Sequence, residues 1–257
     1  MVKRSGEEQR PLLLVVNDDG IGAPGIQALA EVASGVGEVV VVAPEQEQSG
    51  KSMALTGTVP VRFKAVPNAR FGLQYTLSGT PVDCVKFGLY HLGERKPDLV
   101  LSGINHGINA ASHAMHSGTV GAALTAAISG CRAVAFSHTL GNRSASLLPY
   151  LPYCEKIIRL ALRDLKEGCT LNVNFPRVSP KGFKVCRQSK TQWESEFEQR
   201  QDASGRDYYW LAGSMLDLEP TAEDSELAVL RAGYISIAPL TVEWTDSKTL
   251  NDLKSWQ

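Results

Sequence analysis

The chain has 257 residues, of which 43% are hydrophobic and 21% are charged, an ordinary composition for a globular protein with one large domain, with or without an extension. The formal net charge of −1 argues against the basic surface that duplex nucleic acid requires. No apolar stretch is long enough to span a membrane, and the polar residues 1–10, which lack the apolar core of a signal peptide, predict a disordered leader.

Cysteine usage indicates a reducing compartment. The five cysteines are scattered and include no C-x-x-C pair: Cys84, Cys131, Cys154, Cys169 and Cys186. Neither a zinc site nor a disulfide framework is therefore expected. Most of them lie in apolar runs, which predicts buried free thiols and a cytoplasmic protein.

The first predicted element is a buried strand over residues 12–16, which are all apolar. A helix over 25–34 follows, with a proline at its start and apolar side chains at helical spacing. Residues 38–43 include four successive valines and predict a second buried strand. Alternating residues over 53–66, with a proline among them, predict an edge hairpin.

Strands and helices keep alternating to about residue 180. The predicted helices cover 81–92, 118–129 and 151–165, and the predicted strands cover 98–101, 132–137 and 169–175. Such alternation predicts an α/β fold with a doubly wound, mostly parallel sheet, in a core over residues 11–180.

Residues 181–257 have a different pattern. The predicted elements are strands over 183–188, 208–211 and 234–238, a polar span over 189–206, and a short helix over 226–232. We interpret this region as a C-terminal β-hairpin or arm, followed by a closing segment of the same domain.

Two adjacent aspartates, Asp18 and Asp19, follow the first strand directly and precede Gly20. Open α/β sheets bind their ligands at the carboxyl ends of the strands. Adjacent carboxylates repel each other, and a hard divalent cation with oxygen ligands relieves that repulsion. Successive strand residues point to opposite faces, so both carboxylates reach one ion only if the chain turns at Gly20. Taken alone, residues 17–20 slightly favour an ordinary acidic turn after a strand.

Three further loops carry small polar residues, at 43–50, 102–109 and 116–119. The first two follow predicted strands, so a parallel sheet places them along the same edge as the aspartates. There the Ser49 hydroxyl and the Asn105 amide oxygen are candidates to join the carboxylates around one ion. A set made only of oxygen donors favours Mg²⁺, Mn²⁺ or Ca²⁺ over zinc or copper.

The third loop opens the predicted helix 118–129 with Ser117, Gly118 and Thr119. Free backbone N–H groups and the helix dipole favour a phosphate there, by about 0.3–1 kcal/mol for an exposed charge. A lone S-G-T is more often an ordinary N-cap, but beside an acidic metal site we prefer an anion-binding site. The glycine-rich loop 102–109 is neither a dinucleotide fingerprint nor a P-loop.

Together these loops resemble the SurE family of survival-protein phosphatases, which act as 5′/3′-nucleotidases. The matching segments are N-D-D-G at 17–20, A-P-G-I at 23–26, A-P-x-x-x-x-S-G at 43–50, S-G-T-P-x-D-C-V at 78–85, S-G-I-N-x-G-x-N at 102–109, S-G-T-V-G-A-A at 117–123 and G-Y-I-S-I-A-P-L at 233–240. The resemblance covers about residues 12–245. It implies a Rossmann-like core with a projecting C-terminal hairpin, and homodimers or homotetramers that exchange arms.

The resemblance also implies roles for individual residues. It implies one divalent ion per subunit, Mg²⁺ or Mn²⁺ with Ca²⁺ as an alternative in a crystal, held by Asp18, Asp19, Ser49 and Asn105. It implies a phosphate pocket lined by Ser117, Gly118 and Thr119. Asn105 and Asn17 are further candidates for contact with substrate, although a structural role in the turn is favoured for Asn17.

The predicted reaction is metal-assisted hydrolysis of a nucleoside monophosphate, with Asp18 and Asp19 holding the ion and one of them orienting the attacking water. His116, which stands where the family usually has Tyr, is a candidate general acid for the leaving alkoxide, with a packing role as an equal alternative. The chain also departs from the family pattern at Ser112–His113 and at Leu124–Thr125. These departures concern substrate preference and leave the predicted metal ligands intact.

Other functions are weighed against this one. A non-catalytic nucleotide-binding module of the same fold is the alternative function. Aspartyl-phosphate chemistry and metal-dependent glycosyl transfer both need D-x-D spacing, which the adjacent aspartates do not provide. The aromatic residues of the arm have two interpretations, stacking on a base or packing in an arm or oligomer interface, and packing is favoured: Trp193, Tyr208, Tyr209 and Trp210. The expected partners are small nucleotides and further copies of the chain, and neither duplex nucleic acid nor a membrane.

Overall fold

The computed structural model describes residues 10–66, 72–138 and 146–256, so the predicted leader lies outside the described residues except for Arg10. Within this part of the chain, nine strands form one sheet: β1 (Leu12–Val16), β2 (Glu38–Pro44), β3 (Phe63–Ala65), β4 (Gly72–Leu77), β5 (Leu99–His106), β6 (Ala133–His138), β7 (Thr170–Phe175), β8 (Phe183–Val185) and β13 (Ile235–Leu240). Their order across the sheet is β3-β4-β2-β1-β5-β6-β7-β13-β8.

The sheet is mostly parallel, as predicted from the alternation of strands and helices. Only β3 against β4 and β13 against β7 run antiparallel among the described strands of this sheet. From β1 the chain moves outward to β2 and β4, then returns to β5 on the other side of β1 and continues to β6 and β7. The winding direction therefore reverses between β1 and β5, and such a switch point is where doubly wound sheets bind ligands.

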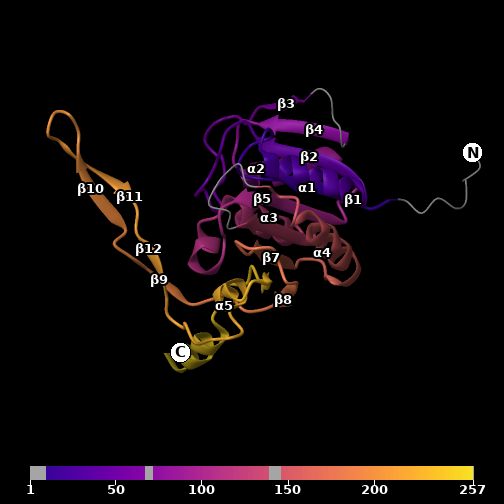
Figure 1. Cartoon of the computed structure of the whole chain (residues 1–257). Coiled ribbons are helices and arrows are strands. Elements are labelled where there is room, and N and C mark those ends of the chain that lie inside the picture. Colours follow the sequence, from indigo (N-terminus) through magenta and orange to yellow (C-terminus); the bar gives the residue numbers. More distant parts are fainter. Residues whose placement is uncertain (1–9, 67–71, 139–145, 257) are drawn as a thin grey trace, which may run out of the picture.

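Helices cover both faces of the sheet (Figure 1). The helical segments are α1 (Pro24–Ser34), α2 (Pro81–Leu92), η1 (Ala111–Met115), α3 (Gly118–Ile128), α4 (Leu151–Asp164), α5 (Glu226–Arg231), α6 (Ser247–Leu253) and η2 (Lys254–Trp256). In the described part of the chain, none combines the length and the apolar character of a membrane span.

Two separate apolar cores hold the layers together. Side chains of β1 alternate between them: Leu13 and Val15 pack with α1 and α4, whereas Leu14 and Val16 pack with α2 and α3. This is the period-two alternation of a strand that is buried on both faces. The five cysteines are free thiols, and all but Cys169 are buried, as expected.

The ends of two helices are set by local sequence. Thr80 and Asp83 form a capping box at the start of α2, with Pro81 in the first turn. The Ser117 hydroxyl accepts a hydrogen bond from the Val120 amide at 3.1 Å and caps α3, as the S-G-T pattern predicts. These caps fix where the polar loops before α2 and α3 end.

A long arm projects from the core (Figure 1). It consists of two antiparallel ribbons, in which β9 (Thr191–Glu194) pairs with β12 (Ser214–Asp217) and β10 (Phe197–Gln201) pairs with β11 (Asp207–Leu211). The predicted C-terminal arm is therefore confirmed. The prediction of a polar span without strands over 189–206 is wrong, because an exposed ribbon needs no apolar face and gives no hydrophobic period.

Two other segments also differ from the sequence-based expectation. The predicted hairpin over 53–66 is wrong: only β3 forms there, as an edge strand paired with the unpredicted β4. Furthermore, β5 continues past Gly103 to His106, beyond the short strand predicted over 98–101. Strands β8 and β13, from the C-terminal region, lie within the main sheet. The assignment of this region as a closing segment of the same domain stays a prediction. The boundary at residue 180 stays a prediction.

Candidate functional site

The chain turns sharply after β1, as the aspartate pair requires. The Asn17 amide nitrogen donates to the Gly20 carbonyl at 2.9 Å, and the Gly20 amide donates back to the Asn17 side-chain oxygen at 3.2 Å. Gly20 has a φ of +96°, which disfavours any residue with a Cβ. Both polar groups of the buried Asn17 side chain thus brace the turn, in keeping with the structural role favoured for it.

Asp18 is the buried member of the pair, with 3% of its surface exposed, whereas Asp19 is half-buried. The Thr119 hydroxyl, at the start of α3, donates a hydrogen bond to the Asp18 carboxylate. A Cβ on Gly118 would lie 3.0 Å from the Asp18 carboxylate oxygen Oδ2, so the first turn of α3 approaches Asp18 closely. The N-terminus of α3 and the end of β1 therefore form one unit.

The electrostatic setting of Asp18 is unfavourable for a lone carboxylate. Burial, and to a smaller extent the neighbouring charge of Asp19, raise its pKa to about 6, although the Thr119 hydrogen bond acts in the opposite direction. A positive charge placed at this point would relieve both effects. The site thus has the electrostatic character of a cation site.

A cavity of about 520 Å³ opens at this end of the sheet, and its size falls in the range of small-molecule sites. Its core side includes the predicted residues Asp18, Ser49, Asn105, Ser117 and His116, together with His106, Asn109 and His113. Asn17, Asp19, Gly118 and Thr119 are not among the lining residues, and they adjoin the cavity through their chain neighbours. The structure thus brings together residues from four loops.

The loop that carries Ser49 is attached to the start of α3. The Ser52 amide donates to the His116 carbonyl at 3.1 Å, and the Ser52 hydroxyl donates to the Met115 carbonyl at 2.7 Å. A Cβ on Gly121 would lie 2.3 Å from the Ser52 carbonyl oxygen, so this close approach requires glycine. Ser49 itself is exposed.

Asn105 is the residue before the last one of β5, and its side-chain amide oxygen is a candidate ligand. Its amide nitrogen donates to the Gly107 carbonyl at 2.9 Å, which leaves the amide oxygen as the atom suited to a cation. No cluster of three or more His, Cys, Asp and Glu side chains able to hold a metal occurs in residues 10–66, 72–138 and 146–256. The predicted ligand set of two carboxylates, a hydroxyl and an amide oxygen stays a prediction, and its chemistry is that of a site for a hard divalent cation.

The arm forms the opposite side of the cavity. Trp193, Glu196, Leu211 and Ala212, near the root of the arm, line it together with the core residues. The Trp193 indole stacks on the His113 ring, with centroids 4.8 Å apart and an interplanar angle of 10°. The sequence singled out Trp193 and favoured packing over stacking on a base, without settling between them. Glu196, Leu211 and Ala212 gave no signal, because only the tertiary fold brings them to the site.

The remaining aromatic candidates lie elsewhere. Tyr208, Tyr209 and Trp210 are exposed on β11 and are not among the cavity-lining residues.

A further histidine, His138, ends β6 beside His106, with ring centroids 5.1 Å apart. Burial lowers the pKa of His138 to about 4, so this imidazole is neutral near pH 7. The sequence analysis did not single out His138. Its position directly after the predicted strand 132–137 was the signal that could have marked it as a neighbour of the site.

Comparisons with known proteins agree with this geometry. The family described as Survival protein SurE matches residues 13–195. The chain is 41% identical to the 5′-nucleotidase SurE of Flavobacterium johnsoniae, over 98% of both chains, and 42% identical to that of Cytophaga hutchinsonii, over 96% of this chain and 98% of the relative. The crystal structure of the SurE protein from Aquifex aeolicus superposes with a TM-score of 0.83 at 36% identity, over 96% of this chain and 99% of that chain. The chain therefore belongs to the SurE family.

Proposed function

We propose that this protein is a divalent-metal-dependent 5′-nucleotidase that hydrolyses nucleoside monophosphates. One observation carries the proposal: Asp18 from the end of β1, Asn105 from β5 and Ser117 from the start of α3 line a single cavity at the switch point of the sheet. Relatives named 5′-nucleotidase SurE, about 40% identical over nearly the whole chain, support the activity. Nothing in these comparisons favours the non-catalytic alternative.

In this proposal Asp18, Asp19, Ser49 and Asn105 hold one Mg²⁺ or Mn²⁺ ion. When bound, the ion supplies neutralisation of phosphate charge and polarisation of a phosphoryl oxygen. The buried position of Asp18 and its raised pKa support this assignment, because a nearby cation favours the ionised form. Thr119 serves the site indirectly, since its hydroxyl is engaged with Asp18.

The substrate phosphate lies at the start of α3, where the Gly118 amide and the Ser117 hydroxyl bind non-bridging oxygens. The Ser117 hydroxyl accepts from the Val120 amide and keeps its own proton to donate. His116 lines the same cavity and is the candidate to protonate the leaving alkoxide. The nucleoside extends toward Trp193 on the arm side. A homodimer or homotetramer and a cytoplasmic location stay predictions.

The test is phosphate release from nucleoside 5′- and 3′-monophosphates with Mg²⁺, with Mn²⁺ and with EDTA. We expect the release of phosphate to depend on the metal and Asp18→Asn to lower its rate at least about 100-fold. Loss of a residue that only orients a metal ligand already lowers metal affinity or activity about 10–100-fold. Circular dichroism checks that the variant is folded. Undiminished turnover by folded Asp18→Asn, or full activity in EDTA, would contradict the proposal.

A further inference from the structure

A buried carboxylate outside the cavity joins the site to the arm. Glu226, the first residue of α5, has no exposed surface, and it is not among the cavity-lining residues. Its carboxylate accepts hydrogen bonds from the Ala111 amide at 2.8 Å and from the Asn172 side chain at 3.1 Å, and a further one from the Ser189 backbone amide. Burying an acidic group is unfavourable unless its oxygens are satisfied, and here three donors satisfy them.

Two of these donors do not line the cavity themselves, but they belong to or contact the chain segment that does. Ala111 lies in the segment over 107–116, which connects Asn105 to Ser117 and which we call the site loop. Ala111 has a φ of +55°, a conformation that L-residues rarely adopt, so its backbone needs support from its surroundings. The Asn172 side chain also donates to the Asn109 carbonyl at 2.8 Å. Glu226 therefore supports the middle of the site loop at two neighbouring points.

The third donor belongs to the root of the arm, the segment over 187–191 that leads from β8 into β9. There the Gln188 side chain donates to the Ala111 carbonyl at 2.7 Å, and the Thr191 hydroxyl donates to the Ser112 hydroxyl at 2.9 Å. The site loop is thus held by the root of the arm on one side and by Glu226 on the other. Both meet at Ala111.

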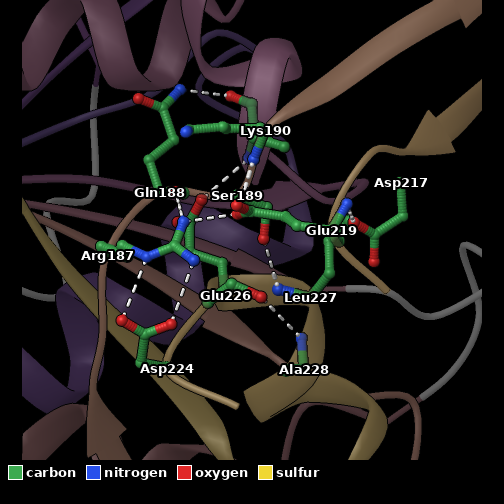
Figure 2. A network of polar contacts seen from close by, with 12 residues as sticks. Arg187, Gln188, Ser189, Lys190, Asp217, Glu219, Asp224, Glu226, Leu227 and Ala228 are labelled. Atoms are coloured by element: carbon green, nitrogen blue, oxygen red, sulfur yellow. Dashed lines mark hydrogen bonds and ion pairs between the residues drawn. The ribbon is translucent and has the colours of Figure 1, made fainter. Parts of the chain in front are cut away.

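The neighbouring acidic residues make a different kind of contact. Figure 2 shows Arg187 between Asp224 and Glu219, close to Glu226. The Asp224 side chain is 72% exposed, and it contacts Arg187 rather than the site loop or the cavity. Exposed ion pairs of this kind contribute little to the free energy of unfolding. Asp224 is therefore a matched control for Glu226, two residues away in sequence and of the same charge.

We propose that Glu226 is a positioning residue of the nucleotidase site, which holds the site loop and the root of the arm in the arrangement that binds substrate. The inference rests on the proposed function of the cavity. Glu226 acts through Ala111 and Asn172 and touches neither substrate nor metal. Because these contacts shape the cavity wall rather than the metal ligands, their loss affects substrate binding more than the chemical step.

The experiment compares Glu226→Ala, Glu226→Gln and Asp224→Asn as full-length proteins, with the best nucleoside monophosphate and saturating Mg²⁺ or Mn²⁺. We expect Glu226→Ala to raise KM about tenfold while kcat changes less than about threefold, since displaced binding groups chiefly weaken binding. Glu226→Gln keeps the volume and one acceptor oxygen, so a smaller rise is expected. Asp224→Asn leaves both constants unchanged.

Hydrogen exchange separates positioning from a general loss of stability. We expect the amides of the site loop to exchange faster in both Glu226 variants, while those of β1 and β5 keep their protection. Unchanged KM and unchanged loop exchange in either folded Glu226 variant would overturn the proposal, as would an equal rise of KM in Asp224→Asn. If Glu226→Ala does not fold, Glu226→Gln decides alone.

The Asp18→Asn variant distinguishes the two proposals. If it is inactive while the Glu226 variants behave as wild type, only the role of Glu226 fails. If it retains full turnover, the assignment of the cavity fails, and the proposal for Glu226 is overturned with it.

Discussion

The two sides of the cavity are built in different ways. On the core side, Asp18, Asn105 and Ser117 are buried. They lie just after β1, near the end of β5 and at the start of α3, and the central sheet and its helices hold these elements in place. On the arm side, Trp193 is half-buried and Leu211 is 77% exposed, on ribbons of two strands that project into solvent. Two-stranded ribbons have little stability of their own. This difference fits our proposal that the buried core side carries the chemistry and that the exposed arm side contacts the nucleoside.

The core side is tested most strongly at the contact between Thr119 and Asp18. Thr119→Val keeps the shape and removes the hydroxyl that orients the buried carboxylate. We expect kcat/KM to fall about 10–100-fold, the usual effect of removing a partner of a metal ligand. Thr125→Val is the control, because the Thr125 hydroxyl in the same helix donates to the Gly121 carbonyl and not to the aspartate. Equal losses in both variants would show that the helix, not the contact, matters.

The arm side is tested at Trp193. We expect Trp193→Ala to raise KM for nucleoside monophosphates about tenfold, because stacking on an aromatic side chain stabilises a bound base by about 1–3 kcal/mol. Hydrolysis of p-nitrophenyl phosphate, which has no base, should change little. Trp210→Ala on the exposed face of β11 is the control. A similar loss with both substrates would place Trp193 in the support of the fold rather than in recognition.

The junction between the two sides is tested by the pH dependence of stability. Burial raises the pKa of Glu226 from 4.5 to about 7. Between these values the folded protein keeps a proton that the unfolded chain has lost, so this group makes stability fall as pH rises, by up to about 1 kcal/mol per pH unit. The Cys186 thiol beside it, with a pKa that burial and the Glu226 charge raise to about 11, stays neutral there.

Other groups titrate in the same window, so the measurement is a difference. Asp18, with its pKa raised to about 6, acts in the same direction as Glu226, and His138, with its pKa lowered to about 4, acts in the opposite direction. Denaturant unfolding of the wild type and of Glu226→Gln from pH 4.5 to 8 isolates the contribution of Glu226. Parallel curves would mean that Glu226 does not titrate as its burial indicates.

The smallest effect is expected at the surface of the same junction. Asp224→Asn removes an ion pair that is exposed on both sides, and we expect the melting temperature to change by less than about 3 °C. High salt should reduce even this difference. A larger, salt-independent drop would show that the exposed network contributes to the junction as much as buried Glu226 does.

Much of the core was predictable because its signals are local. The apolar run of β1 reports burial on both faces, and Ser117 reports the start of α3 because a cap is satisfied within three residues. Strands β9 and β10 were missed for the opposite reason, because an exposed ribbon buries no apolar stripe. The hairpin predicted over 53–66 was too long, and only β3 forms in that range. Alternation alone does not show whether a partner strand is present.

The sequence by itself determined the fold class and the family, because strand ends, turns and helix caps depend on neighbouring residues. The residues that hold a cation and a phosphate were predicted from the same local signals and stay predictions. Only the tertiary structure decided what surrounds them. The Thr119 contact with Asp18 spans 101 residues, and the Ala111 contact with Glu226 spans 115. A single sequence carries no local signal for contacts of that range, because they arise only when the sheet is wound and the chain returns from the arm to the core.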